Sequence, residues 1–589
     1  MVELARLEEF ERAVYFRARE DRIAENQKAL DTMFQCLTAL RSGAYFAQGD
    51  RVMKPAELTR MCAAIVALFC DPGFRLTQDG FNKIAAEKAV IDTLFIASAF
   101  ETPDYVYGLI DDETEHLNKY LLLFSINSEL DLDLETVFRQ DPQATFGLYL
   151  SLLGYGQVFT PQADARREKL IGMAAIFDEV MPDPMLYNAL CGAYMHVSYA
   201  HGRDKHAPKR VIHRMMERVM APHVAQKPFG PQARKARPTV LMVFEWWHSK
   251  HAMYRSYAKS IMQLKRDFRI VGTCPGQIAD DESKLLFDEW LDFPGDQMVL
   301  AQIAERFQAL APDIIYYPSI GMGVWVIAMS SLRLAPIQVM TYGHPATSNS
   351  PVIDYGLIEE DCLDPSRFSE RMIALPANTV KPTPYAEVAA RHTPRKTDVV
   401  RIAISAMQVK VTWPFVQALQ QVMERANKTV ELWFFSATSG IGMHSMANEL
   451  SKYLANVTVQ EQQLYEEYMQ TMAECDLCLF SFPFGGANSA YDALTLGLPM
   501  VSIEGDEPHS KSDASIIRRA GLPESLIAQS VDEYVEIILR LLDDDERARI
   551  ANLTAAVDME TRFHTPDASN AFVDAFRNIY LTNTVEEAA

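Results

Sequence analysis

The sequence predicts an α/β protein in which an all-helical N-terminal domain precedes two domains with doubly wound parallel sheets. In residues 1–226, apolar residues recur at spacings of three and four, which is typical of amphipathic helices. After Pro238, short apolar runs alternate with helical patterns. That rhythm indicates parallel strands covered by helices on both faces. The length of 589 residues is compatible with three or four domains of roughly 150 residues each.

Proline-rich stretches separate the predicted domains. Residues 227–238 combine prolines with basic residues and are predicted to be a linker, and a second break runs from residue 381 to residue 394. The predicted domains are residues 1–226, residues 238–383 and residues 398–589, the last of which includes C-terminal helices.

Ten short apolar runs are predicted as strands, five in each sheet. In the first sheet they are residues 239–244, 270–272, 314–317, 337–340 and 355–358. In the second sheet they are residues 399–405, 430–435, 457–459, 477–480 and 500–503. A helix is predicted from Pro414 to Ala426 with Thr412 as its N-cap. Because ligands of such folds bind beyond the carboxyl ends of the strands, polar residues after each strand are candidates for a site.

Charge and composition exclude several classes of protein. Lys and Arg total 56 against 78 Asp and Glu, a net charge of −22, which argues against nucleic-acid binding. No apolar run approaches the roughly 20 residues that span a bilayer, and the acidic N-terminus is unlike a signal peptide. We therefore expect a cytoplasmic protein without membrane insertion or a nucleic-acid partner.

The cysteines do not resemble a disulfide framework, because eight of them are scattered over a long chain. Cys475 and Cys478 form a C-x-x-C motif within an apolar stretch. We interpret both as packing residues of a buried strand, since neither a helix N-terminus nor a second ligand pair accompanies them. A metal or redox role is the alternative.

The segment from Phe482 to Asp492 is the most informative for function, because it joins a predicted strand to a predicted helix. Gly485 and Gly486 lack side chains where a ligand can approach the backbone, and free N–H groups at the helix start attract anions. Asn488 and Asp492 share a helix face. Asn488 can cap the helix or bind phosphate, and Asp492 can accept hydrogen bonds from ribose hydroxyls. The alternative is a plain glycine turn before a capped helix.

Other polar residues follow other predicted strands. Lys410 comes after the first strand of the second sheet, where a cation can meet a diphosphate, although a solvated lysine is the alternative. His248 and His251 follow the first strand of the first sheet and are candidates for general base work or acceptor binding, unless they belong to a polar loop. His344 lies in a Gly and Pro turn, either at the edge of the cleft or simply exposed.

Two common phosphate-binding signatures do not identify the site. The sequence contains no P-loop, which makes a kinase or ATPase of that type unlikely. Asp131 and Asp133 form a D-x-D motif, but they fall in the helical region and are interpreted as a solvated acidic patch. A nucleotide-sugar site here would therefore neutralise its diphosphate without a metal, through Lys410 and the helix start after Gly485 and Gly486. No metal or other cofactor is expected.

Many blocks of this sequence, in their order and spacing, resemble the bacterial cytoplasmic N-glycosyltransferases that modify high-molecular-weight adhesins, relatives of the O-GlcNAc transferases. The resemblance covers nearly the whole chain. The blocks that carry it are residues 195–199, 248–251, 254–255, 318–322, 333–338, 343–347, Lys410, 482–492, 495–498 and 521–523. It implies a helical domain packed on a GT-B pair of Rossmann-like domains.

The resemblance also implies an activity, which is inverting, metal-independent transfer of glucose from UDP-glucose to Asn in Asn-x-Ser/Thr sequons of adhesin-like proteins. The implied roles are Lys410 at the diphosphate, Asn488 at a phosphate, Asp492 at the ribose, His251 near the acceptor and donor sugar, and Arg255 and His344 along the cleft. Alternatives are transfer to Ser/Thr or to a protein-bound sugar, another UDP-hexose as donor, and a non-catalytic protein-binding scaffold.

Three positions depart from the family pattern. Trp246 and Glu466 stand where family members carry His, and Thr438 stands where a Gln follows the second strand of the second sheet. All three fall near the donor or acceptor side, with Thr438 a candidate donor contact. They leave the sugar and acceptor preference open, together with the identity of the amide activator.

Overall fold

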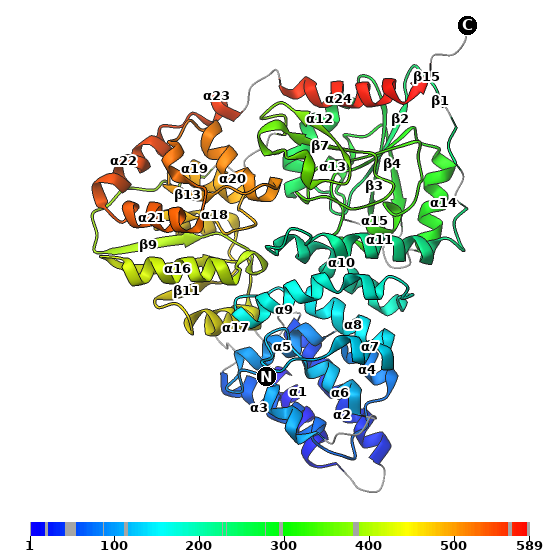
Figure 1. Cartoon of the computed structure of the whole chain (residues 1–589), viewed down its shortest axis with the longest axis vertical. Coiled ribbons are helices and arrows are strands. Elements are labelled where there is room, and N and C mark those ends of the chain that lie inside the picture. Colours follow the sequence, from blue (N-terminus) through cyan, green and yellow to red (C-terminus); the bar gives the residue numbers. More distant parts are fainter. Residues whose placement is uncertain are drawn as a thin grey trace. The chain divides into compact units, whose positions relative to one another are not determined.

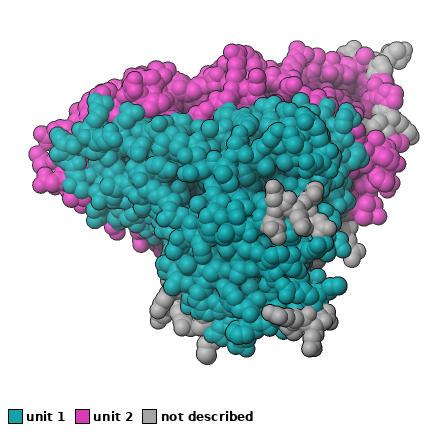
Figure 2. All heavy atoms as spheres, turned by 60° about the horizontal axis from the view of Figure 1, so that its bottom comes forward, with its two compact units in different colours: residues 1–196, 401–463 teal, residues 197–400, 464–589 magenta. Residues whose placement is uncertain are grey.

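The computed structural model describes residues 2–17, 22–41, 55–85, 87–110, 116–225, 228–230, 232–276, 278–293, 299–380, 388–563 and 568–585. The chain divides into two compact units (Figure 2). Unit 1 contains residues 1–196 and 401–463, and unit 2 contains residues 197–400 and 464–589. The predicted break at residues 381–384 and part of the predicted linker lie outside the described residues.

The N-terminal region is helical, as its apolar spacing predicts. Its helices are α1 (Val2–Tyr15), α2 (Arg22–Arg41), α3 (Pro55–Phe69), α4 (Gln78–Ala85), α5 (Lys88–Ala97), α6 (Leu117–Leu123), α7 (Leu134–Gln140), α8 (Pro142–Leu153), α9 (Pro161–Gly172), α10 (Tyr187–His196) and α11 (Ala207–Met220). Each of α8 and α9 begins with a proline after a capping side chain, because Asp141 and Thr160 accept backbone N–H groups of the first turn. No described helix is long and apolar enough to cross a membrane.

The D-x-D motif has local partners in this helical region. Asp133 caps α7 by accepting a hydrogen bond from the backbone N–H of Thr136. Asp131 forms an exposed ion pair with Lys169 at 3.0 Å. Both contacts agree with its interpretation as a surface feature.

The first sheet has seven strands in the order β4-β3-β2-β5-β6-β7-β8, and all neighbours are parallel. Its strands are β2 (Thr239–Val243), β3 (Arg269–Pro275), β4 (Glu289–Phe293), β5 (Ile314–Tyr317), β6 (Ile337–Met340), β7 (Tyr355–Glu359) and β8 (Arg371–Leu375). Its helices are α12 (Ala252–Leu264), α13 (Asp281–Lys284), α14 (Leu300–Leu310) and α15 (Val324–Met329). The register places Val240 of the interior strand β2 opposite Ile270 and Ile314. All five predicted strands are present, and the two strands that were missed lie at the edges.

The C-terminal helix α24 (Ala568–Thr582) completes the core of this first sheet. Phe572 and Phe576 are fully buried there, and the ring of Phe576 lies 5.3 Å from that of Tyr316. The helix packs on α12, as Figure 1 shows in red and green. The next strand, β15 (Thr584–Val585), pairs with β1 (Gln232–Ala233). Residues that the sequence groups with the second domain thus supply part of the first domain's core.

The second sheet has six strands in the order β11-β10-β9-β12-β13-β14, which is the 3-2-1-4-5-6 order of Rossmann folds. Its strands are β9 (Val399–Ile404), β10 (Thr429–Phe435), β11 (Val457–Gln460), β12 (Leu477–Leu479), β13 (Met500–Ile503) and β14 (Ile527–Ala528). Its helices are α16 (Trp413–Arg425), α17 (Gly440–Ser451), α18 (Tyr465–Ala473), α19 (Asn488–Leu496), α20 (Pro508–Arg519), α21 (Val531–Leu541), α22 (Asp544–Ala555) and α23 (Met559–Phe563). The five predicted strands are confirmed, and Thr412 occupies the predicted N-cap position. Cys475 and Cys478 are buried free thiols, as expected of packing residues.

Candidate functional site

The loop between β2 and α12 carries the predicted histidines and is held by two carboxylates. Glu245 is buried and accepts hydrogen bonds from Ser319 Oγ at 2.6 Å and from the Gly321 N–H at 2.7 Å. Asp280 accepts the backbone N–H of Ser249 at 3.1 Å. These contacts order the loop on both sides. Neither anchor was singled out from the sequence, although a glutamate directly after a buried strand is a signal that could have identified Glu245.

His251 occupies the N-cap of α12, and this position determines which ring nitrogen carries the proton. Its Nδ1 accepts the backbone N–H of Met253 at 3.3 Å. Burial and the neighbouring His248 lower the pKa of His251 to about 4, so its ring is neutral at pH 7. A neutral imidazole that accepts at Nδ1 carries its proton on Nε2. His251 therefore offers an N–H donor. Trp246, 45% exposed, lies beside this ring with a centroid separation of 6.4 Å.

His344 is buried, so the alternative of a simply exposed histidine is wrong. Its side chain is 5% exposed, and its Nε2 lies 2.8 Å from Ser198 Oγ. The ring stacks on Phe484 with centroids 6.3 Å apart. Phe484 also packs against Tyr199 at 4.4 Å and His509 at 4.6 Å. His344 thus belongs to an aromatic cluster within unit 2 rather than to a solvated loop tip.

The backbone N–H groups of the glycine turn have partners within the protein, while anion binding at the helix start that follows stays a prediction. The Gly485 N–H donates to the His509 carbonyl at 2.7 Å. Those of Gly486 and Ala487 donate to the two carboxylate oxygens of Asp513 at 2.7 and 2.6 Å. A buried carboxylate from α20 therefore occupies the N–H groups of the two residues that precede α19.

Asn488 and Asp492 lie one turn apart on α19, as their spacing predicts. Asp492 accepts hydrogen bonds from the hydroxyls of Tyr465 at 2.7 Å and Tyr468 at 3.4 Å. Burial raises the pKa of Asp492, while the Tyr465 hydrogen bond and the positive charge of Arg255 oppose that rise. Arg255 on α12 therefore acts electrostatically on Asp492 on α19, and unit 2 brings together one predicted acceptor-side residue and one predicted donor-side residue.

Lys410 and Thr438 belong to unit 1, where each follows a strand of the second sheet. Lys410 ends the 3-10 turn Gln408–Lys410 after β9. Thr438 follows β10 and lines a cavity of about 770 Å³. The Gln157 amide stabilises this region, donating to Gln408 Oε1 at 2.9 Å and to the Gly442 carbonyl at 3.1 Å. The cavity is therefore lined both by the helical region and by the segments that follow two strands of unit 1.

The remaining predicted residues are placed more simply. His248 packs against His251 with ring centroids 5.3 Å apart, and Glu466 is exposed in the first turn of α18. Within the described ranges, no three His, Cys, Asp or Glu side chains form a group that could hold a metal ion. The substrate contacts of all these residues stay predictions.

Comparison with known proteins identifies relatives over most of the chain. Residues 135–220 match the family described as HMW1 domain 2. The UDP-glucose:protein N-beta-glucosyltransferase of Actinobacillus pleuropneumoniae serotype 5b is 29% identical over 520 residues, which are 83% of each chain. The protein of the same name from serotype 7 is 28% identical with the same coverage. A probable UDP-N-acetylglucosamine–peptide N-acetylglucosaminyltransferase SPINDLY of Petunia hybrida is 24% identical over 239 residues, 37% of this chain and 24% of its own.

The fold is also shared with a solved structure. A mutant of the O-GlcNAc transferase of Thermobaculum terrenum superposes with a TM-score of 0.60 over 99% of both chains, at 14% sequence identity. This match supports the fold and confirms the predicted helical domain with a GT-B pair. By sequence the chain is a relative of the UDP-glucose:protein N-β-glucosyltransferases along most of its length, and by fold it is a GT-B protein of the O-GlcNAc transferase type.

Proposed function

We propose that this chain transfers glucose from UDP-glucose to the side-chain amide of Asn in Asn-x-Ser/Thr sequons of adhesin-like proteins, with inversion and without a metal ion. The observation that carries the proposal is the similarity, over 83% of both chains, to a UDP-glucose:protein N-beta-glucosyltransferase. The match to HMW1 domain 2 supports an adhesin-like acceptor. Lys410 and His251 each follow a strand, and Asp492 lies on a helix that follows a strand. Such folds bind their ligands at these positions.

The proposed reaction is a single displacement at the anomeric carbon. The acceptor nitrogen forms the new C–N bond while the bond from carbon to the β-phosphate oxygen breaks. Its electron pair stays on UDP, and the amide nitrogen releases one proton to the leaving diphosphate or to water. Negative charge grows on the leaving diphosphate, so a fixed cation such as Lys410 and a donor such as Asn488 at the positive end of α19 lower the barrier.

His251 serves in this proposal as a hydrogen-bond donor and not as a base. Its Nδ1 is engaged by α12, and the proton of its neutral ring is on Nε2. That N–H suits an oxygen atom, either a sugar hydroxyl or the carbonyl of the acceptor amide. Holding the acceptor carbonyl orients a nitrogen that is by itself a poor nucleophile.

A His251→Asn substitution is expected to lower kcat on the order of 10²-fold, because it removes one donor from the reacting groups. Asparagine is a good N-cap, so α12 should keep its start and circular dichroism should be unchanged. Since the pKa of His251 is about 4, the ratio of wild-type to variant kcat should stay constant from pH 6 to 9. A ratio that titrates near pH 6.5 would contradict the donor role. The exposed His223→Asn is the matched control and should keep full activity.

The proposed activity is tested by intact-mass measurement of one Asn-x-Thr peptide with UDP-glucose and other UDP-hexoses. We expect addition of one hexose from UDP-glucose, mapped to Asn, with a β-linked product by NMR and no loss of rate in a chelator. Gln-x-Thr and Asn-x-Ala peptides are the matched controls and should stay unmodified. Modification of Thr, or preference for another hexose, would replace the acceptor or the donor in the proposal. Absence of both transfer and UDP binding by calorimetry would indicate a scaffold.

A further inference from the structure

We infer that Asp513 is a positioning residue for the donor nucleotide. Its carboxylate holds the turn that starts α19 and thereby sets where Asn488 and Asp492 lie. The inference rests on the proposed function, because it takes α19 as part of the donor site. The sequence pattern assigns no role to this residue.

The contacts of Asp513 are directed at the turn. Its side chain is 2% exposed, and its two oxygens accept the N–H groups of Gly486 and Ala487 at 2.7 and 2.6 Å. Hydrogen bonds to an ionised acceptor are about twice as strong as neutral ones. The carboxylate therefore fixes the N-cap residue Ala487 and the residue before it, and α19 begins at the following residue, Asn488.

The turn needs such a partner because its backbone is strained. Ala487 has φ of 49° and ψ of −85°, a conformation that costs energy for any residue with a side chain. Ala487 also provides no side-chain cap for α19. Two short hydrogen bonds to one carboxylate can hold this conformation. Without them the turn is expected to relax, and Asn488 and Asp492 would move with it.

Gly485 fits closely against Asp513, and Gly486 fits closely against Ser489. A Cβ added to Gly485 would lie 2.0 Å from Asp513 Oδ2, and one added to Gly486 would lie 2.3 Å from Ser489 Oγ. The turn thus requires glycine at position 485 for the approach of the Asp513 carboxylate and at position 486 for the close approach of Ser489. The expected approach of a ligand is not needed to explain these residues.

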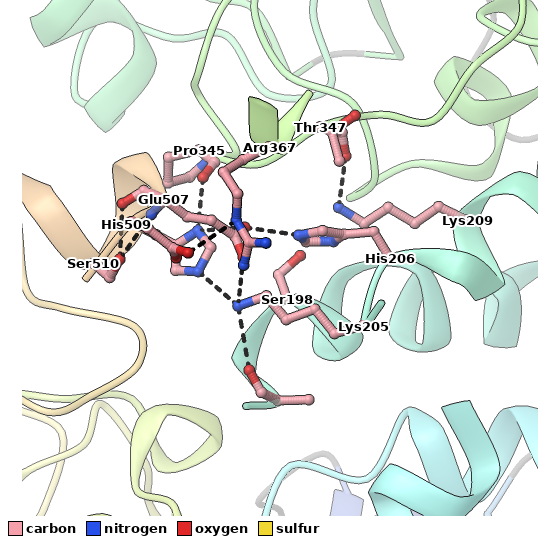
Figure 3. A network of polar contacts seen from close by, with 12 residues as sticks. Ser198, Lys205, His206, Lys209, Pro345, Thr347, Arg367, Glu507, His509 and Ser510 are labelled. Atoms are coloured by element: carbon pink, nitrogen blue, oxygen red, sulfur yellow. Dashed lines mark hydrogen bonds and ion pairs between the residues drawn. The ribbon is translucent and has the colours of Figure 1, made fainter. Parts of the chain in front are cut away.

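Asp513 is itself held by a helix that is anchored at both ends within unit 2. At the start of α20, Glu507 contacts Lys205 at 3.1 Å and His206 at 2.8 Å, in the network drawn in Figure 3. At its end, Arg519 forms ion pairs with Glu359 at 2.8 Å and Asp361 at 2.5 Å. These anchors keep α20 in place, so the position of Asp513 is set by the rest of unit 2.

The test is Asp513→Asn. Asparagine keeps one acceptor oxygen but turns its NH₂ toward the second backbone N–H. We expect KM for UDP-glucose to rise about tenfold, and UDP affinity by calorimetry to fall by the same factor. KM for the acceptor peptide should not change. A purely structural role would lower stability without this separation of the two KM values.

Two further variants make the experiment specific. Ala487→Gly in the Asp513→Asn background should recover most of the UDP affinity, because glycine adopts positive φ without strain. This double variant also decides the matter if Asp513→Asn alone does not fold. Glu504→Gln is the matched control, because Glu504 pairs with Arg518 of the same helix at 2.6 Å, and it should leave UDP affinity unchanged.

The outcomes separate the two proposals. If the wild-type protein does not bind UDP, the proposed function fails. If it binds UDP and Asp513→Asn binds equally well, the positioning role is overturned while the proposed function stands. A folded double variant with no recovery of affinity over Asp513→Asn would also overturn the role.

Discussion

A Lys410→Ala variant is expected to lose on the order of 10²–10³ in kcat with UDP-glucose, the loss typical of removing one group that stabilises developing charge. The diphosphate gains one further negative charge as it leaves, and the proposed site neutralises its charge with protein groups. Lys410 ends the turn after β9, where parallel α/β folds bind their ligands. A single-turnover measurement at saturating UDP-glucose checks the effect on the chemical step.

Lys452→Ala is the matched control for this experiment. Lys452 also belongs to unit 1 and pairs with Glu101 at 3.1 Å and Glu449 at 3.3 Å. Its loss is expected to cost at most about 1 kcal/mol of stability and no activity. Full activity of Lys410→Ala, with the fold intact by circular dichroism, would remove Lys410 from the mechanism.

A Glu507→Gln variant is expected to lose about 3–5 kcal/mol of unfolding free energy at pH 7, the cost of breaking a buried ion pair on one side. Glu507 and Lys205 are both almost fully buried, with Nζ and Oε1 3.1 Å apart. His206 and Arg367 contact the same carboxylate at 2.8 and 3.4 Å (Figure 3). Without the carboxylate, the Lys205 ammonium stays buried without its main counter-charge.

The pH dependence of this effect has a definite sign. Burial opposes the charge of Glu507, but His509, His206 and Lys205 hold its pKa well below the usual range. A carboxyl with a lowered pKa contributes its stability fully above the unfolded-state pKa of about 4.3. The contribution is lost as the pH falls below that value toward the folded-state pKa. Urea unfolding should therefore show a constant difference between wild type and Glu507→Gln above pH 5 and a shrinking one below pH 4.

Two controls separate the buried pair from a surface effect. Glu504→Gln breaks the partly exposed pair with Arg518 and should cost at most about 1 kcal/mol. Lys205→Met combined with Glu507→Gln should recover part of the loss, because it removes the unpaired ammonium. If the double variant is less stable than Glu507→Gln, the unpaired charge is not the cause.

The strands were predictable because a buried parallel strand is a continuous apolar run, and each such run forms a strand, from residues 239–244 to residues 500–503. The edge strands β4 and β8 were missed because each mixes charged and apolar residues and is only partly buried. The two-residue β14 is too short for a pattern. These strands were missed because of their positions in their sheets. A short segment of sequence carries no information about where its strand lies in the sheet.

In the candidate site, the sequence indicated the strand-end positions and the spacing of Asn488 and Asp492, because these depend on neighbours along the chain. Only the tertiary structure decided which residues far apart in the sequence contact one another. Asp513 fills the turn from 26 residues away, and Lys205 reaches His509 from 304 residues away. A hydrogen-bond donor takes whichever acceptor folding brings within reach, and the cost of burying it unpaired forces that choice. The type of each element was therefore determined by local chemistry, and the partner of each buried polar group by the fold.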